Sequence, residues 1–397
     1  MTDSLRVGLI GSGFLARTRA RCWARVHGVA VERAAVASSA RAKADEFAAR
    51  TGFGRGLSVD ELLAEESIDL VDLCVPNRVH RELTERAAAA GKHVLCTKPL
   101  AAYWGQGLGD DASAESVAAV DRQDMYLRAL ADANAMVEAC GAAGVKLFYG
   151  ENWIFAPAVQ RAAQLQAASN GLLLEMRGWE SHSGSHSPYS KDWRHTGGGA
   201  LLRLGAHPIG AMLWLKRREG LRRRGTPTVV TSVTAEVADP TASAILDGAR
   251  TAVATGWKGV ESWGMAVLHF DDGTRGTVFG SDLMLGGMQS HLSLMGSDHR
   301  FECALSPHDQ LRAYAPDDGT FGSEYVMEKV DGQAGWSTPL PDEDWSSGQQ
   351  GLLQAVAEDL TADREPRCSG ALGLDVTRIV YAAYVSAAEG RRVELED

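Results

Sequence analysis

The chain has 397 residues, of which 45% are hydrophobic and 23% charged, and its formal net charge at pH 7 is −11. This length allows two domains of ordinary size, and the composition is typical of a globular protein. The negative charge disfavours a general nucleic-acid binder, whose affinity depends on Lys and Arg neutralising phosphates. No apolar run approaches the ~18 residues of a membrane span. We therefore expect neither nucleic acid nor membrane as a partner.

The six cysteines are scattered and form no Cys-x-x-Cys pair. Unpaired thiols are typical of a reducing compartment. The N-terminus lacks the charged lead and apolar stretch of a secretory signal. We therefore expect a cytoplasmic protein.

The first apolar run ends at Ile10 and leads directly into Gly11-Ser12-Gly13-Phe14-Leu15-Ala16. A strand followed by Gly-x-Gly-x-x-Ala and a helix is typical of dinucleotide binding. Gly11 allows the tight turn, and Gly13, which has no Cβ, lets a pyrophosphate approach the backbone. The helix that begins near Phe14 and Leu15 offers unpaired N–H groups to the phosphates. This motif predicts a dinucleotide cofactor, which we take to be NAD or NADP.

Residues 6–100 alternate strand and helix patterns, which predicts a parallel sheet with helices on both faces. Strands are expected at 7–10, 31–37, 70–75, 93–96 and 145–149, and helices at 14–25, 41–51, 60–65, 82–90 and 125–143. Residues 103–124 interrupt this rhythm and are expected to form an inserted loop. The pattern predicts a doubly wound Rossmann domain over residues 1–150.

The second half of the chain has longer strand-like runs, at 172–179, 228–237, 263–270, 276–281 and 291–295. Asp271-Asp272-Gly273 is a hairpin-turn signal between two of them. These runs predict an α+β domain over residues 151–397, with a large, mostly antiparallel open sheet that binds substrate and forms oligomer contacts. A final helix at about 373–388 is expected to close the chain and to pack against the first domain.

The residues after the second strand bear on the choice between NAD and NADP. An acidic side chain there usually binds the ribose hydroxyls of NAD. This chain instead has Ser38, Ser39 and Arg41, with Lys43 close by. Such groups suit a 2′-phosphate, which a carboxylate would repel, so we expect NADP slightly more than NAD. The alternative is that Arg41 and Lys43 are ordinary exposed helix residues.

Several dispersed motifs, in order along the chain, resemble those of the Gfo/Idh/MocA oxidoreductase family. They are the glycine turn, Pro76-Asn77-x-x-His80, Thr97-Lys98-Pro99, Gly197-Gly198-Gly199 leading to His207, and Ala383-Tyr384-x-Ser386-Ala387-x-x-Gly390. The resemblance covers nearly the whole chain. It implies a Rossmann domain followed by a domain on a large open sheet, and a homo-oligomer such as a dimer or tetramer. It also implies that Pro76, Asn77, His80 and Lys98 contact the cofactor.

The resemblance further implies two catalytic residues, Lys98 and His207. The Lys98 ammonium would bind the reacting oxygen and stabilise an alkoxide, although the family usually has Glu where this chain has Thr97. His207 would act as general acid or base. Four residues earlier the family commonly has Asp, and this chain has Arg203. Arg203 could bind a carboxylate, sulfonate or phosphate on the substrate, or it could turn outward into solvent.

A histidine-rich segment over residues 180–195 is expected to form a loop at the substrate, since hydroxyls, imidazoles and aromatic rings suit sugar recognition. An alternative use of His182, His186 and Glu180 is a metal site, but the glycine and proline in the segment favour a loop, and we expect no metal. The residues predicted to bind substrate are Glu151, Asn152, His182, His186, Trp193, Arg194, Arg203 and His207.

The leading interpretation is an NAD(P)-dependent oxidoreductase that acts on a CH–OH or keto carbon of a sugar, sugar derivative or cyclitol. Two alternatives stay open. One is an NAD-dependent, redox-neutral glycoside hydrolase, which oxidises a sugar carbon transiently. The other is a non-catalytic Rossmann-type binding protein, which the unusual Thr97 and Arg203 would fit.

Overall fold

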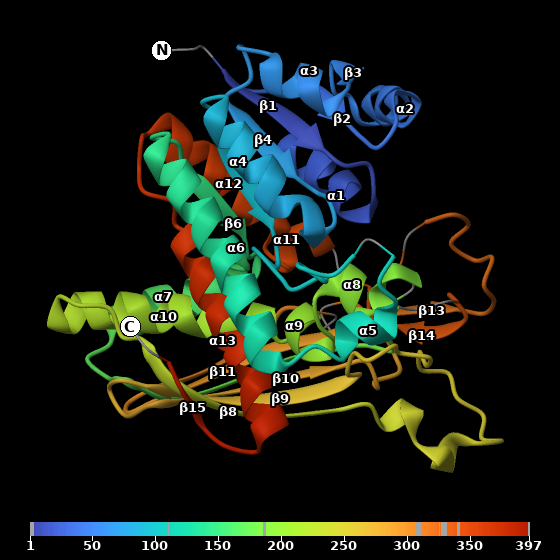
Figure 1. Ribbon diagram of the computed structural model, residues 1–397, viewed down its shortest axis with the longest axis vertical. Coiled ribbons are helices and arrows are strands. Elements are labelled where there is room, and N and C mark those ends of the chain that lie inside the picture. The colour runs from blue at the N-terminus through green and yellow to red at the C-terminus, as the bar shows by residue number, and fades with distance from the viewer. Residues whose placement is uncertain are drawn as a thin grey trace.

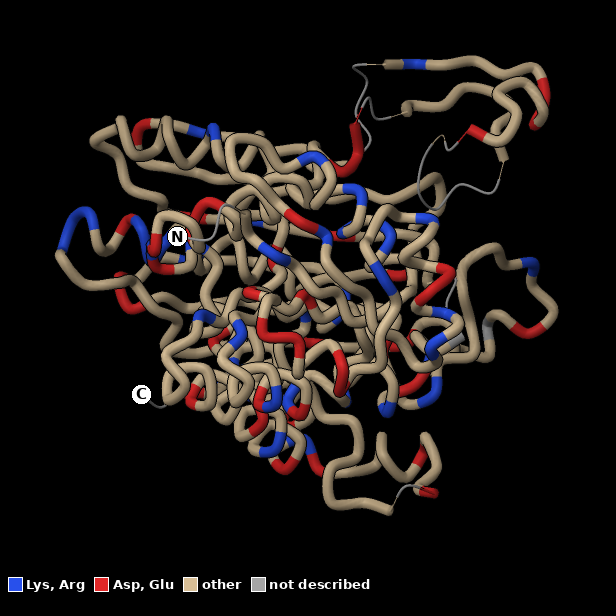
Figure 2. The backbone as a smooth tube through the Cα atoms, turned by 90° about the horizontal axis from the view of Figure 1, so that it is seen from above, with Lys and Arg blue, Asp and Glu red and all other residues tan. Residues whose placement is uncertain are grey.

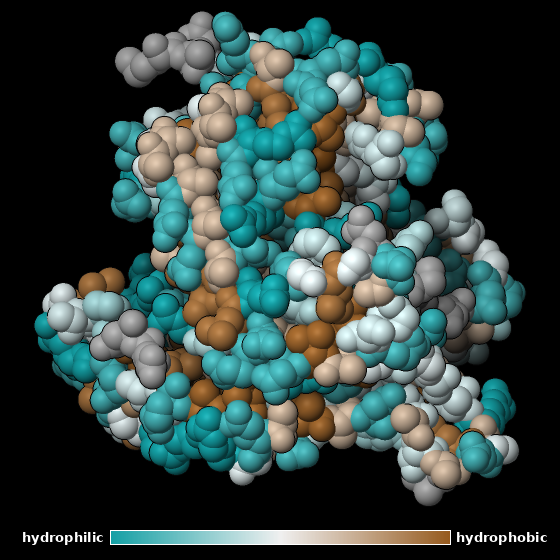
Figure 3. All heavy atoms as spheres, viewed as in Figure 1, coloured by the Kyte–Doolittle hydropathy of each residue, from teal (hydrophilic) through white to brown (hydrophobic). Residues whose placement is uncertain are grey.

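Two sheets organise the molecule, with helices between and around them (Figure 1). The computed structural model describes residues 4–395 except 110, 186–187, 307–310, 325, 327–331 and 340–341. Basic and acidic residues are interspersed along the chain (Figure 2). On the face shown in Figure 3, polar residues predominate and hydrophobic residues appear in narrow areas between them.

The first sheet has six strands in the order β3-β2-β1-β4-β5-β6, and every neighbouring pair is parallel. This is the strand order of a doubly wound dinucleotide-binding fold. Because helices cover both faces of such a sheet, its strands are nearly continuous apolar runs. The strands are β1 (Leu5–Ile10), β2 (Val31–Ala37), β3 (Arg55–Leu57), β4 (Leu70–Leu73), β5 (His93–Thr97) and β6 (Leu147–Gly150).

The inserted loop expected at residues 103–124 is shorter than predicted and contains one short helix, α5. The long helix that follows it, α6, begins at Arg122, because the backbone N–H groups of Gln123 and Asp124 donate to the Asp121 side chain, at 2.8 and 3.3 Å. An aspartate at this position is a strong helix start. The helices of this part are α1 (Phe14–Trp23), α2 (Arg41–Thr51), α3 (Val59–Ala64), η1 (Asn77–Val79), α4 (His80–Ala89), α5 (Ala114–Ala118) and α6 (Arg122–Ala142).

The second sheet has seven strands in the order β12-β11-β7-β10-β9-β8-β15. Its neighbours are antiparallel except β7 and β10, which run parallel. The expected fold class, a Rossmann sheet plus a mostly antiparallel one, is confirmed. The strands are β7 (Leu173–Ser181), β8 (Val230–Ala238), β9 (Trp263–Phe270), β10 (Arg275–Ser281), β11 (Gln289–Gly296), β12 (Arg300–Ala304) and β15 (Val393–Glu394).

Small residues let helices approach one face of this sheet. A Cβ on Gly178 would lie 2.5 Å from the Pro208 Cβ, and one on Gly280 would lie 2.4 Å from the Ala200 carbonyl oxygen. The alternating side chains of these strands therefore point to the other face. The remaining helices are η2 (Trp153–Phe155), α7 (Pro157–Ala168), η3 (Pro188–Lys191), α8 (Trp193–Thr196), α9 (Ala200–Arg203), α10 (Ala206–Arg224), η4 (Pro240–Ala242), η5 (Ala244–Leu246), α11 (Glu343–Ser346), α12 (Gln349–Thr361) and α13 (Gly370–Glu389).

The C-terminal helices pack against the first sheet's helices, α13 along α6 and α12 on α1 (Figure 1). Gln350 donates from Nε2 to the Cys22 carbonyl oxygen at 3.2 Å, and Arg21 pairs with Asp344 at 3.0 Å. The last fifty residues therefore belong to the cores of both parts, and the division at residue 150 stays a prediction. A separate two-stranded ribbon is formed by β13 (Ala313–Ala315) and β14 (Gly335–Ser337). No helix in the described part of the chain is long and apolar enough to cross a membrane.

Candidate active site

The glycine turn between β1 and α1 has the space that a dinucleotide needs. Gly11 has a φ of 127°, and a Cβ there would lie 2.2 Å from the Cys74 carbonyl oxygen, so only glycine fits. Gly13 precedes α1, and a Cβ there would meet no heavy atom within 4 Å. Phe14 follows and is 59% exposed. An open backbone at a helix N-terminus is what a pyrophosphate requires, so these residues fit NAD(P).

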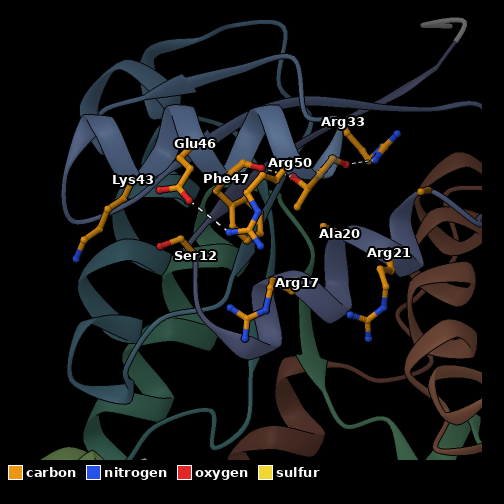
Figure 4. A pocket seen from close by; sticks show the side chains of 11 residues that line it. Ser12, Arg17, Ala20, Arg21, Arg33, Lys43, Glu46, Phe47 and Arg50 are labelled. Atoms are coloured by element: carbon orange, nitrogen blue, oxygen red, sulfur yellow. Dashed lines mark hydrogen bonds and ion pairs between the residues drawn. The ribbon is translucent and has the colours of Figure 1, made fainter. Parts of the chain in front are cut away.

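Near the end of β2 lie two serine hydroxyls and the side chain of Lys43, whereas Arg41 forms ion pairs with neighbouring carboxylates. Ser12 and Ser38 share a hydrogen bond of 2.8 Å between their Oγ atoms. Arg41 pairs with two carboxylates, Asp45 at 3.3 Å and Glu61 at 3.0 Å. Both pairs are exposed to solvent, and the expectation that Arg41 contacts the cofactor stays a prediction. Lys43 lies on α2 above Ser12, at one end of a groove between α1 and α2 (Figure 4).

His80 connects the end of β4 to the segment that carries Lys98. Its Nδ1 lies 3.0 Å from the Pro99 carbonyl oxygen, and its Nε2 lies 2.9 Å from the Val75 carbonyl oxygen. Burial lowers the pKa of His80, and the carbonyl contacts act in the opposite direction. His80 and Asn77 are both buried. In this structure the Pro76-Asn77-x-x-His80 motif therefore holds the shape of the loop beside the cofactor turn.

Lys98 bridges the two sheets. It follows β5, and its ammonium donates to the carbonyl oxygen of Arg203 at the end of α9. The C-terminal ends of parallel strands are where doubly wound folds bind their ligands. This contact brings the Lys98 ammonium to the end of α9, directly before the turn that leads to His207.

His207 is oriented by a fully buried carboxylate. Its Nδ1 lies 2.8 and 3.0 Å from the two oxygens of Glu151, which is 0% exposed. The Trp153 N–H donates to Glu151 Oε1 at 2.9 Å, and the Trp153 ring stacks on the imidazole at 5.8 Å and 7°. Since an ionised carboxylate only accepts hydrogen bonds, Nδ1 carries the proton and Nε2 is left for chemistry. Glu151 thus lies behind His207, not on the substrate side as expected.

Asn152 also differs from its predicted place. It is buried, and its side-chain amide donates to the Ser347 carbonyl oxygen at 2.6 Å. This bond joins the end of β6 to the turn before α12.

Arg203 is neither in solvent nor unpaired. Its guanidinium makes two contacts with Asp282, of which Nη1 to Oδ1 is 3.4 Å, and it lies 5.0 Å from the centre of the Trp257 ring. Asp282 is fully buried and also lies 3.3 Å from His182 Nδ1. Sequence reasoning missed Asp282 and Trp257. The signal for Asp282 is its position directly after β10, which matches that of His182 after β7.

A third buried carboxylate, Glu261, fixes the glycine-rich segment. It accepts the N–H groups of Gly199 at 3.0 Å and Leu201 at 2.9 Å, and the Tyr384 hydroxyl at 2.8 Å. Burial raises the pKa of Glu261. The C-terminal Tyr384 motif thus supports the segment that carries Arg203, a link that the sequence alone did not indicate.

Two residues predicted to bind substrate instead hold the inserted segment. Trp193 is 1% exposed and lies 4.4 Å below the Arg122 guanidinium. Arg194 donates to the carbonyl oxygens of Ala112 and, at 3.1 Å, Gly109. His186 lies outside the described residues. Within the described residues, no group of three His, Cys, Asp or Glu side chains is placed to hold a metal.

Two family models match the chain. Residues 5–119 match the oxidoreductase family with an NAD-binding Rossmann fold, and residues 161–302 match the GFO/IDH/MocA C-terminal domain. The chain belongs to the Gfo/Idh/MocA oxidoreductase family. Its membership confirms the resemblance, the oxidoreductase class and an NAD(P)-binding first domain, without separating NAD from NADP.

Among relatives of this Gfo/Idh/MocA protein is D-xylose 1-dehydrogenase (NADP(+)) 2 of Haloferax volcanii. It is 26% identical over 374 residues, which are 92% of each chain. Levoglucosan dehydrogenase of Pseudarthrobacter phenanthrenivorans is 28% identical over 220 residues, 52% of this chain and 50% of that one.

Solved structures of similar fold include GenD2 from gentamicin A biosynthesis in complex with NAD. It has a TM-score of 0.78 at 24% identity and covers 100% of this chain and 98% of that one. Levoglucosan dehydrogenase in complex with NADH and levoglucosan has a TM-score of 0.72 at 20% identity, over 99% and 100% of the two chains. At these identities the likeness concerns the fold.

Proposed function

We propose that this oxidoreductase transfers hydride between NAD(P) and a hydroxyl or keto carbon of a sugar, sugar derivative or cyclitol. The observation that carries the proposal is the meeting of Lys98 with the turn before His207, whose imidazole Glu151 orients. The names of the relatives, dehydrogenases of xylose and levoglucosan, support the substrate class.

In the oxidative direction, His207 Nε2 accepts the proton of the reacting hydroxyl, while Glu151 stabilises the resulting imidazolium through Nδ1. The Lys98 ammonium stabilises the negative charge that develops on the substrate oxygen. A nicotinamide dinucleotide held at the glycine turn by Gly11, Gly13 and the start of α1 would supply the hydride acceptor for the carbon that bears this hydroxyl. In the reverse direction His207 returns the proton.

The test is an assay of the purified protein against a panel of sugars, uronates and cyclitols, with NAD⁺ and NADP⁺ supplied separately. Substrate-dependent formation of reduced cofactor, abolished by Lys98→Met, is the expected result. Cleavage of a glycoside without net reduction would favour the redox-neutral hydrolase. Cofactor binding with no turnover of any substrate would favour the non-catalytic binding protein.

For the cofactor, we favour NADP over NAD. Ser12 after β1 and Ser38 after β2 are hydrogen-bonded to each other, Lys43 lies above Ser12, and Arg17 lines the same groove (Figure 4). None of these carries the negative charge that would repel a 2′-phosphate. Fluorescence titration with NADPH and NADH tests this preference. Lys43→Glu is expected to weaken NADPH at least about tenfold and to leave NADH unchanged.

The Asp282 carboxylate alters what Arg203 implies about the charge of the substrate. An isolated arginine would favour an acidic sugar, but here a buried carboxylate balances its charge. This ion pair supports a neutral polyol over a uronate or sugar phosphate, and the substrate panel separates the two.

We also propose a homo-oligomer that uses the outer face of the seven-stranded sheet. The Trp179, Phe279 and Met265 side chains lie in one cross-strand row on that face, only partly exposed. A contiguous apolar row is an expected contact surface. The cytoplasmic location remains part of the proposal, supported by six cysteines without disulfides.

A further inference from the structure

The two-stranded ribbon of β13 and β14 lies at one side of the molecule, outside both sheets (Figure 1). Tyr314 and Trp336 face each other in its antiparallel register, and their ring centres are 5.4 Å apart at an angle of 57°. The Arg312 guanidinium lies 4.7 Å from the centre of the Trp336 ring. The proposed reaction uses none of these side chains. We call the described residues between 311 and 339 the arm.

The aromatic face of the arm is turned outward. Tyr314 is 57% exposed and Trp336 is 66% exposed, whereas Ala315 is fully buried. Successive residues of a strand point to opposite faces, so the packed alanine holds the aromatic face in solvent. Trp, Tyr and Arg are the side chains that contribute most to the binding energy of protein interfaces. The arm therefore has the composition of an interface anchor.

The loop that joins the two strands of the arm is acidic. In the part of the chain that the structure describes, Asp317, Asp318 and Glu324 have no lysine or arginine within ion-pair distance. The N–H groups of Ala334 and Gln333 donate to Asp318 at 2.8 and 2.7 Å and lower the pKa of its carboxyl. This carboxylate is therefore ionised at neutral pH, and it holds the two ends of the loop together.

A surface of the opposite charge lies at the C-terminal end of α10, at the other side of the molecule (Figure 1). Arg218, Leu221 and Arg222 are three or four residues apart, so they share one face of the helix. All three are exposed, Leu221 by 54%. Among the described residues, no carboxylate lies within ion-pair distance of Arg218, Arg222 or Arg223. We call these four residues the basic cluster.

The contacts of the basic cluster inside its own chain leave its charge unbalanced. Arg222 and Arg223 donate to backbone carbonyl oxygens at 3.1 and 2.7 Å, and Arg218 lies 4.6 Å from the centre of the Trp214 ring. A guanidinium has five N–H groups, so donors remain for a carboxylate. Three unbalanced arginines are unexpected in a chain with a net charge of −11. They attract a surface of opposite sign.

We propose that the arm of one subunit binds the basic cluster of a second copy of this chain. The two surfaces lie at opposite sides of one molecule, so a contact between them joins two copies (Figure 1). Trp336 and Tyr314 pack on Leu221 and the arginine stems, and the carboxylates of the arm pair with the guanidinium groups. A two-fold dimer makes this contact twice, once with each arm.

The contact adds to the sheet-face interface and does not replace it. Two aromatic side chains bury about 150–250 Å² each, well below the ~1,200 Å² of a stable interface. The inference therefore rests on the proposed homo-oligomer. It assigns to that oligomer a second pair of surfaces, which fixes how the two copies are oriented.

The first test measures the dissociation constant of the wild-type dimer and of two variants by sedimentation over a dilution series. Trp336→Ala, on the arm, is expected to raise the constant at least about tenfold. Arg218→Gln combined with Arg222→Gln, on the exposed helix face, should raise it by a similar factor. Leu127→Gln, at an exposed position of α6, is the control and should leave it unchanged.

The second test identifies the surface that the arm contacts. The photo-cross-linking residue p-benzoylphenylalanine replaces Trp336 in the full-length protein, and ¹⁵N-labelled and unlabelled chains are mixed. Mass spectrometry is expected to find a cross-link from the arm of one chain to an α10 peptide of the other. The same photo-cross-linker in place of Leu127 should give no such product.

A wild-type dimer whose dissociation constant is unchanged by both variants would overturn the arm contact and leave the sheet-face proposal intact. A wild-type monomer would overturn both. Cross-links confined to one chain, or formed with a surface other than α10, would also overturn the contact. Binding of maltohexaose that is lost in Trp336→Ala, with an unchanged dimer, would replace the second copy with a saccharide.

Discussion

At the residue scale, the imidazole of His207 is fixed from two directions. Glu151 holds Nδ1 from behind, and the Trp153 ring lies parallel to the imidazole. A buried carboxylate that accepts from Nδ1 selects one tautomer and stabilises the protonated ring. The chemistry at Nε2 therefore depends on a residue that the substrate does not reach.

Glu151→Gln is expected to lower kcat by about 10²- to 10³-fold while KM changes little. The glutamine amide can still accept the Trp153 N–H, but its NH₂ group then faces Nδ1 and favours the wrong tautomer. Steady-state kinetics with a substrate found in the panel measure the effect. NADH affinity and the circular dichroism spectrum should match those of the unchanged protein. An unaltered kcat would remove Glu151 from the proton-transfer scheme.

Asp282→Asn is expected to lower the free energy of unfolding by about 3 kcal/mol, because it leaves the partly buried Arg203 guanidinium without its carboxylate. Urea denaturation measures the change. The double variant Asp282→Asn with Arg203→Met removes the unbalanced charge and should recover most of the loss. If the double variant were less stable than the single one, the ion pair would not be the cause.

At the element scale, the parallel pair β7 and β10 decides which residues share the site. Ser181 pairs with Ser281 in the register, so His182 and Asp282 emerge side by side. The strand patterns predict an antiparallel sheet, in which these two ends would lie far apart. His182 was predicted from its histidine-rich segment, whereas Asp282 comes beside it only through the direction of this one strand pair.

The two glycines of the first turn should respond differently to alanine. Gly11→Ala is expected to destabilise the protein by more than about 2 kcal/mol, because of its positive φ and the 2.2 Å contact with the Cys74 carbonyl oxygen. Gly13→Ala should fold normally, since its Cβ enters open space, yet weaken binding of NADH. Thermal unfolding and cofactor titration of both variants check this contrast. Unchanged NADH binding by a stably folded Gly13→Ala variant would show that the open space is not a cofactor site.

A cross-strand cluster on β11 and β12 predicts a pH effect. Partial burial opposes ionisation of Glu302, but hydrogen bonds from His291, Ser293 and Arg300 prevail and lower its pKa from 4.5 to about 2. A lowered carboxyl pKa stabilises the fold above pH 4.5, and this contribution is lost as the pH falls towards about 2. The melting temperature should therefore be higher than that of Glu302→Gln at pH 7, and the difference should shrink below pH 4.5. A difference independent of pH would refute the ionic origin.

At the scale of the whole molecule, the C-terminal helices join the two sheets and one face of the larger sheet stays outside. α13 packs along α6, and α12 packs on α1. The row of Trp179, Phe279 and Met265 lies on the sheet face turned away from α9 and α10. That arrangement leaves this apolar row partly exposed on the outer face, where we propose that a second copy of the chain binds.

Phe279→Arg is expected to convert an oligomer into monomers, because a charge at the centre of an apolar interface is costly to bury. Sedimentation velocity measures the mass of the wild-type protein and the variant. Leu127→Arg, at an exposed position of α6, is the matched control and should leave the mass unchanged. A wild-type protein that sediments as a monomer would contradict the proposed interface.

The sequence by itself determined the glycine turn, the alternation of the first sheet and most strand positions of the second, and it proposed Lys98 and His207 as catalytic residues. Those features are local. A tight turn needs glycine at one position, and the spacing of apolar residues within a short stretch indicates a helix or a strand. The tertiary structure decided the roles of Glu151, Glu261 and Asp282, and the occupation of Arg41. Each depends on contacts between residues distant in the chain, where pairing direction and burial, rather than local pattern, decide which charges meet.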